Sequence, residues 1–153
     1  MINNMNLTII FEWILQLHSL WAILTMTIIF YTVLRFFFNA LQNKIFTLLD
    51  LRIALFTLIF CHIQFIIGIV LYFLSPKFKW WYNGLEEILE NNEYFFYLVK
   101  HPLLNIFSIL SITIGWSLFK KAKTNQKRFT RIGVFYLIGF LLILLATPYG
   151  KWL

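Results

Sequence analysis

Four long apolar segments constrain this chain more than any other feature of its sequence. They occupy approximately residues 7–38, 51–74, 102–119 and 132–147. About 20 consecutive apolar residues cross a bilayer core as a helix, and an unpaired backbone cannot lie in lipid. The composition agrees, because only 12% of the residues are charged, whereas about a quarter are charged in a soluble domain. We therefore predict one domain, an all-α integral membrane four-helix bundle.

The charged residues predict the topology of this bundle. The first connection carries Arg35, Lys44 and Arg52, and residues 120–131 carry six further Lys and Arg. Because cytoplasmic loops are rich in Lys and Arg, both connections are expected to be cytoplasmic and both termini to face outward. Arg35 is expected to snorkel to the inner surface. This placement of the basic residues favours a lipid membrane over nucleic acid as the partner.

The second connection, residues 75–101, is the only long stretch expected outside the membrane. Trp80, Trp81 and Tyr82 are typical of an interfacial aromatic belt. Apolar residues then recur at helical spacing among glutamates, which predicts a short amphipathic helix on the outer surface. Those apolar residues are Leu85, Ile88 and Leu89. This helix would cover the end of the bundle or dock a partner.

The three histidines of the chain are the candidate functional residues. Helical rise places His18 and His62 at similar depths on different helices, and His101 at the outer mouth of the third. Two imidazoles at one depth suit the axial positions of a b-type haem. Cys61 precedes His62 without a C-x-x-C-H motif, so it is interpreted as an apolar packing residue. The same-face residues that would enclose the haem are Trp21, Thr25 and Phe65.

His101 opens a stripe of small and polar residues along one face of the third segment. Asn105, Ser108, Ile112 and Gly115 follow it at spacings of four, three, four and three. Such a stripe is typical of a helix contact in membranes, which is the interpretation of Ser108 and Gly115. For His101 and Asn105, a quinone site, a haem-propionate contact and a third metal ligand remain open.

Gln64 and Gly68 lie on a different face of the second segment from His62. Gln64 is expected to hydrogen-bond a neighbouring helix rather than a ligand, because amide side chains in membrane helices commonly bond across to another helix.

Short motifs along nearly the whole chain resemble a family of small four-helix bacterial membrane proteins described as cytochrome b-like. The motifs are Leu17-His18-Ser19, Phe60-Cys61-His62-Ile63-Gln64 with Gly68 and Leu71-Tyr72-Phe73, His101-Pro102, Ile114-Gly115 with Lys120-Lys121-Ala122, Phe135-Tyr136 and Thr147-Pro148-Tyr149. The chain departs from the family pattern after His18, where Ser19-Leu20-Trp21 lacks a glycine and an arginine. A fainter similarity, through His62, Gln64 and Gly68, is to a four-helix half of haem A synthase.

The resemblance implies a multi-pass protein of the bacterial inner (cytoplasmic) membrane that carries haem b. It implies electron transfer with a quinone or a respiratory complex, as a component rather than a stand-alone enzyme. Two other functions stay open. One is a cofactor-free membrane subunit or assembly factor, and the other is a small proton-coupled transporter that uses Glu12 and His18.

Overall fold

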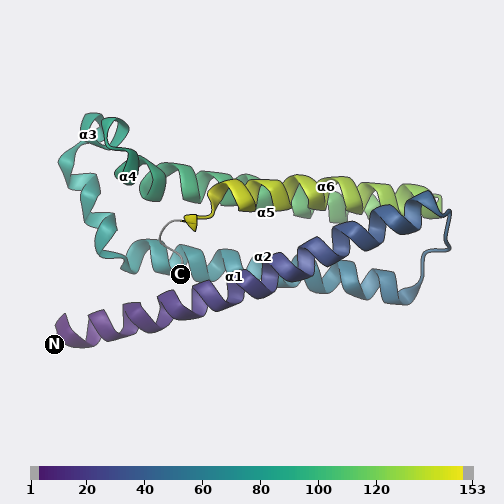
Figure 1. The fold of residues 1–153 in the computed structure, drawn as a ribbon, viewed down its shortest axis with the longest axis horizontal. Helices are drawn as coiled ribbons and strands as arrows, with labels where there is room; N and C mark the ends of the chain where they lie inside the picture. Colours follow the sequence, from purple (N-terminus) through teal and green to yellow (C-terminus); the bar gives the residue numbers. More distant parts are fainter. Residues whose placement is uncertain (1–3, 150–153) are drawn as a thin grey trace.

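The computed structural model describes residues 4–149, and these residues form an all-helical bundle (Figure 1). Its long helices are α1 (Asn4–Leu41), α2 (Leu48–Leu74), α5 (His101–Lys120) and α6 (Asn125–Ala146). Within the described range, four helices are long and apolar enough to cross a membrane. The start of α1 and the end of α6 lie at the same end of the bundle as α3 and α4 (Figure 1).

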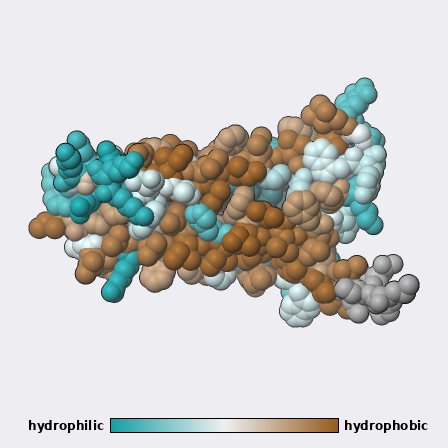
Figure 2. All heavy atoms as spheres, turned by 180° about the vertical axis from the view of Figure 1, so that it is seen from behind, coloured by the Kyte–Doolittle hydropathy of each residue, from teal (hydrophilic) through white to brown (hydrophobic). Residues whose placement is uncertain are grey.

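The flanks of the bundle are apolar on the outside. Large hydrophobic side chains such as Leu20, Ile66 and Leu145 are more than half exposed. Figure 2 shows a largely hydrophobic surface along the middle of the molecule, with hydrophilic residues gathered at both ends. A soluble monomer rarely exposes apolar surface on this scale. Lipid tails are therefore the natural surroundings of these flanks.

Side-chain caps fix the starts of α2 and α6. Thr47 and Asp50 form a reciprocal capping box at α2, and Thr124 Oγ1 accepts a hydrogen bond from the Lys127 backbone at α6. Helix α6 thus begins at Asn125 rather than near 132 as predicted, because a capped helix can carry basic side chains in its first turns outside the apolar layer. Lys127 belongs to that helix and not to a loop. Helix α1 likewise extends beyond its predicted range of 7–38 at both ends.

The sequence predicted that Arg35 snorkels to the surface, but in the structure its side chain forms an ion pair. Its Nε and Nη2 donate to Asp50 Oδ1 at 3.0 and 2.8 Å, and the Asp50 side chain is 2% exposed. Asn39 also lies 3.4 Å from the same oxygen, and the other carboxylate oxygen accepts from Thr47. A buried carboxylate requires such partners. This cluster therefore ties α1 to the start of α2.

Helices α5 and α6 pack closely through small residues. Ser108 Oγ and Ser111 Oγ donate to the carbonyls of Gly139 and Phe135, both at 2.8 Å. A Cβ added to Gly115 would lie 2.5 Å from Phe135 Cβ, so the two backbones approach too closely for a larger residue. The interpretation of Ser108 and Gly115 as helix-contact residues is confirmed.

The largest buried cluster joins α1, α2, α5 and α6 toward the end that holds the α1–α2 connection. Its members include Phe36, Cys61, Phe129 and Tyr136. Tyr136 Oη donates to the Ala54 carbonyl at 3.0 Å, which satisfies its buried hydroxyl. Cys61 is 5% exposed and packs within this cluster, which confirms its predicted role as an apolar residue.

The connection between α2 and α5 is more helical than predicted. It consists of a 3-10 helix (Pro76–Asn83), α3 (Leu85–Glu90), α4 (Asn92–Phe95) and a π-helical turn (Phe96–Lys100) that continues into α5. The predicted apolar face of α3 is only partly right, because Ile88 is fully buried whereas Leu85 and Leu89 are exposed. Six residues make fewer than two turns, so one apolar residue is enough to anchor α3.

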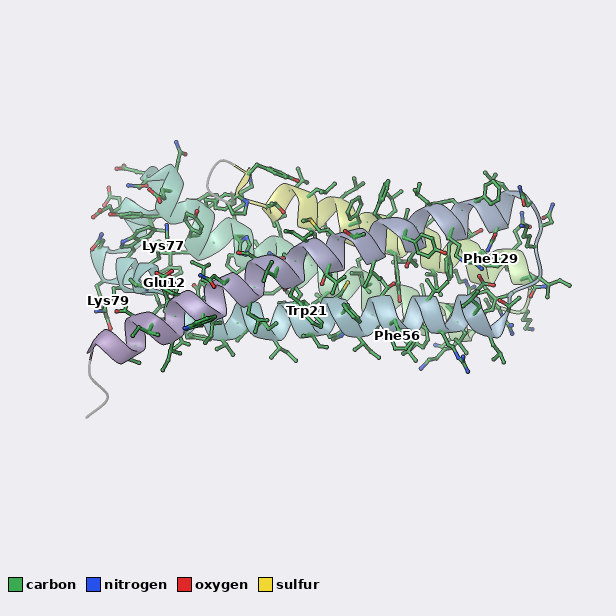
Figure 3. All side chains as sticks on the ribbon, turned by 60° about the horizontal axis from the view of Figure 1, so that its bottom comes forward. Glu12, Trp21, Phe56, Lys77, Lys79 and Phe129 are labelled. Carbon is green, nitrogen blue, oxygen red and sulfur yellow. The ribbon has the colours of Figure 1, made fainter. Side chains whose placement is uncertain are left out.

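Figure 3 shows Glu12 at the same end of the bundle as Lys77 and Lys79, and Phe129 near the opposite end. Lys77 Nζ lies 3.1 Å from Glu93 Oε1 and 3.7 Å from the ring centre of Tyr97. These contacts hold the connection between α2 and α5 together. The Glu12 side chain is exposed, in keeping with its position near the N-terminal end of α1.

Candidate histidine site

His18 and His101 face each other across the bundle. Their ring centres are 6.4 Å apart and their planes meet at 62°. His18 lies in the N-terminal half of α1, and His101 is the first residue of α5. A second aromatic ring, that of Phe96, lies 6.1 Å from the His101 ring. The structure thus brings together two of the three candidate histidines, from helices that are far apart in sequence.

Gln64 of α2 packs against His18. Its Nε2 donates to the His18 carbonyl at 3.1 Å and lies 3.3 Å from both nitrogens of the imidazole. The expectation that Gln64 bonds a neighbouring helix is confirmed. Because a point equidistant from Nδ1 and Nε2 lies off the in-plane lone-pair direction of each, Gln64 engages neither nitrogen in line. Gln64 Oε1 is buried and has no hydrogen-bond partner within residues 4–149.

Gly68, one turn beyond Gln64, leaves room for the His18 ring against α2. A Cβ at this position would lie 3.3 Å from His18 Cε1, which is tighter than most carbon contacts in proteins. A larger side chain would press the imidazole away from α2. Gln64 and Gly68 therefore set the position of His18 together.

His101 is held by the end of α6. Its Nδ1 donates to the Ala146 carbonyl at 2.7 Å. Carbonyls in the last turn of a helix lack a partner within that helix, so Ala146 is free to accept. This bond fixes the neutral tautomer with the proton on Nδ1 and the lone pair on Nε2. Asn105 is not part of this bond, since its Nδ2 donates back to the His101 carbonyl at 2.7 Å.

His62 faces a different neighbour from the other two histidines. Its Nδ1 donates to the Leu58 carbonyl at 2.8 Å, and its Nε2 lies 3.4 Å from Thr113 Oγ1 on α5. Thr113 is twelve residues beyond His101, which corresponds to about 18 Å along a helix. The contacts of His18 lead to Gln64 and His101, whereas those of His62 lead to Leu58 and Thr113.

The residues predicted to enclose a haem are spread along α1 and α2. Trp21 Nε1 donates to the Phe60 carbonyl at 3.1 Å, and the two rings stack with centres 4.8 Å apart. Thr25 is 2% exposed, and its hydroxyl has no hydrogen-bond partner in the part of the chain that the structure describes. Phe65 is half-buried on α2. Trp21 therefore serves the α1–α2 contact directly.

Among residues 4–149, no group of three or more His, Cys, Asp or Glu side chains is arranged to hold a metal ion. The His18–His101 pair offers two nitrogen ligands, which is the number that a six-coordinate haem iron takes from a protein. The sequence gives only a weak signal for pairing His101 with His18. His101 lies at the start of a helix, so its estimated depth depends on where that helix begins.

Comparisons with protein-family models, with curated proteins and with solved structures find no match to this chain. The resemblance to cytochrome b-like membrane proteins stays a prediction that rests on the motifs.

Proposed function

We propose that the chain is a membrane cytochrome b-like protein that binds one b-type haem between α1 and α5. His18 and His101 would hold the haem iron. The bound haem would supply one-electron chemistry, with a quinone or a respiratory membrane complex as the redox partner. The single observation that carries this proposal is the 6.4 Å separation of the His18 and His101 rings.

The 6.4 Å between the two ring centres is close to the distance expected when two imidazoles bind one metal ion. A bond of roughly 2 Å from an imidazole nitrogen to a metal ion places the centres of two opposed rings roughly 6 Å apart. The pair predicted from the sequence was His18 with His62, and the contacts of His62 with Leu58 and Thr113 favour replacing it by His101.

The surroundings of the two imidazoles fit ligation. A histidine that binds a metal ion through one ring nitrogen typically donates a hydrogen bond from the other, often to a backbone carbonyl. His101 Nδ1 donates such a bond to the Ala146 carbonyl. His18 has no in-line partner for its ring nitrogens among the described residues, because Gln64 sits between both. A half-buried imidazole without in-line partners is costly unless something else binds it. Coordination to the haem iron would satisfy His18.

The chain's own residues would perform three tasks in this function. Gln64 and Gly68 position the His18 ring, as their contacts show. The Ala146 carbonyl keeps the proton of His101 on Nδ1 and so leaves Nε2 for the metal. Exposed apolar flanks keep the site within lipid, where a low dielectric tunes the potential of a haem.

The test is an absorption spectrum of the full chain, expressed with ample haem and purified in mild detergent. We expect a Soret band that is lost in His18→Ala and in His101→Ala and retained in His62→Ala, which is the matched control. Loss in His62→Ala with retention in His101→Ala would restore the pair predicted from the sequence. A wild-type protein without a Soret band would refute haem binding.

A cofactor-free membrane subunit is the second candidate function, favoured by one observation. The bonds from Gln64 to His18 and from His101 to Ala146 join α1 to α2 and α5 to α6. Polar bonds of this kind stabilise helix association in membranes without a ligand. This function predicts a colourless protein that co-purifies with a larger complex and loses thermal stability in His101→Ala.

A further inference from the structure

We propose that a cavity at the basic end of the bundle binds the phosphate headgroup of an anionic membrane lipid. The cavity has a volume of about 270 Å³ and lies between the α1–α2 connection, the end of α5 and the start of α6. Lys120 and Arg128 supply its cations. Its apolar walls are Phe46, Leu48, Leu51 and Phe119. This site is separate from the histidine site and does not depend on haem.

The charge of this end favours an anion. Residues 35–52 and 120–131 contain nine Lys and Arg and a single acidic residue, Asp50. Asp50 is already engaged by Arg35 and Thr47 and is buried. It is therefore not available to neutralise Lys120 and Arg128. Figure 2 shows the hydrophilic residues gathered at this end, beside the apolar flank.

The two cations of the cavity keep donors free for a ligand. Arg128 makes one hydrogen bond within residues 4–149, from Nε to the Ala122 carbonyl at 3.4 Å. Its guanidinium carbon lies 5.8 Å from the Phe46 ring centre, which holds the side chain over the cavity wall. Both terminal nitrogens remain for a phosphate, which a guanidinium fork can bind with two parallel bonds. Lys120 adds a second cation, held 5.3 Å from the Trp116 ring centre.

Apolar walls distinguish a lipid from a free anion. Leu48 lines the cavity and is 73% exposed, so it continues the lipid-facing surface of α2 into the site. A molecule that joins a phosphate to acyl chains can contact both kinds of wall. Basic pockets between transmembrane helices on the cytoplasmic side bind anionic headgroups in this way. The positive charge of this end predicts that it faces the cytoplasm.

The experiment uses the purified full chain in nanodiscs of equal phosphatidylglycerol and phosphatidylcholine, with bound lipid counted by native mass spectrometry after detergent release. The cavity variant is Lys120→Gln with Arg128→Gln. The control is Lys123→Gln with Lys127→Gln, which removes the same charge from the same end outside the cavity. Thermal melting checks that both variants fold.

We expect the wild type to retain phosphatidylglycerol selectively. The bound ratio should fall about tenfold or more in the cavity variant, because it removes two cations that line the cavity and each would favour an anionic headgroup roughly fivefold. The loss should be clearly smaller in the control, because Lys123 and Lys127 do not line the cavity. Equal losses in both variants would show a diffuse surface charge and overturn the site. Displacement of the lipid by millimolar inorganic phosphate alone would assign the site to a free anion and overturn the lipid.

Discussion

Substituting Gly115 by alanine should separate α5 from α6. A Cβ at this position would lie 2.5 Å from Phe135 Cβ, whereas carbon atoms in contact are roughly 3.5–4.0 Å apart. The obstructing atom is bonded directly to the α6 backbone, so a rotamer change of Phe135 cannot move it. The helices themselves must therefore shift by roughly 1 Å.

The size of the effect can be worked out against a matched control. In Gly133→Ala, the new Cβ would meet ring atoms of Phe37 at 3.5–3.6 Å, which is ordinary contact. Both variants gain the same helix propensity, which cancels in the comparison. Overpacking costs about 1–3 kcal/mol, and weakening the nearby Ser111 bond adds about 0.6 kcal/mol. Gly115→Ala should thus be less stable than Gly133→Ala by about 1.5–3.5 kcal/mol.

The assay is reversible unfolding in mixed micelles, in which dodecyl sulfate is titrated against a mild detergent and helicity is followed by circular dichroism. The free energy of unfolding should fall in Gly115→Ala and stay the same or rise in Gly133→Ala. Equal free energies for the two variants would refute the claim that α5 and α6 are in backbone contact at Gly115.

Three other changes test separate contacts in the same unfolding assay. Asp50→Asn should lower the free energy of unfolding by about 1–3 kcal/mol, because the partly buried Arg35 guanidinium loses its charged hydrogen-bond partner. Arg35→Gln in the same background should then cost little more. Tyr136→Phe should cost about 1 kcal/mol through the lost bond to an α2 carbonyl, and an unchanged stability would show that water or lipid replaces the bond. Gly139→Ala should destabilise the bundle, because the new Cβ would lie 2.6 Å from Ile112 Cγ1. The cost should shrink in an Ile112→Ala background, and strictly additive costs would show that the two side chains do not clash.

Helix positions were predictable because bilayer thickness imposes a length on any spanning segment. The predicted boundaries failed where polar chemistry, rather than hydropathy, ends a helix. Thr124 caps α6 several residues before its apolar stretch begins. Asp50 similarly takes part in the cap of α2 and also pairs with Arg35. Hydropathy cannot reveal this pair, because its members are 15 residues apart in sequence.

The sequence narrowed the site to three histidines and favoured the pair His18 and His62, whose contacts in the structure lead to different neighbours. It placed Gln64 and Gly68 on one face of α2, and both now contact His18. It could not relate His101 to His18, because depth along a helix says nothing about which faces of two helices meet. The crossing of α1 over the bundle decides that relation.

By itself, the sequence determined that this chain forms four apolar helices, where its charges gather, and which few ionisable side chains could carry chemistry. These properties follow from local composition and helical period, which are written into each segment. Only the tertiary structure decided that His18 faces His101 and Gln64 while His62 faces Thr113. Such pairings depend on how helices rotate and cross. For α5 and α6, the close approach at Gly115 and Gly139 sets that geometry through packing rather than through sequence pattern.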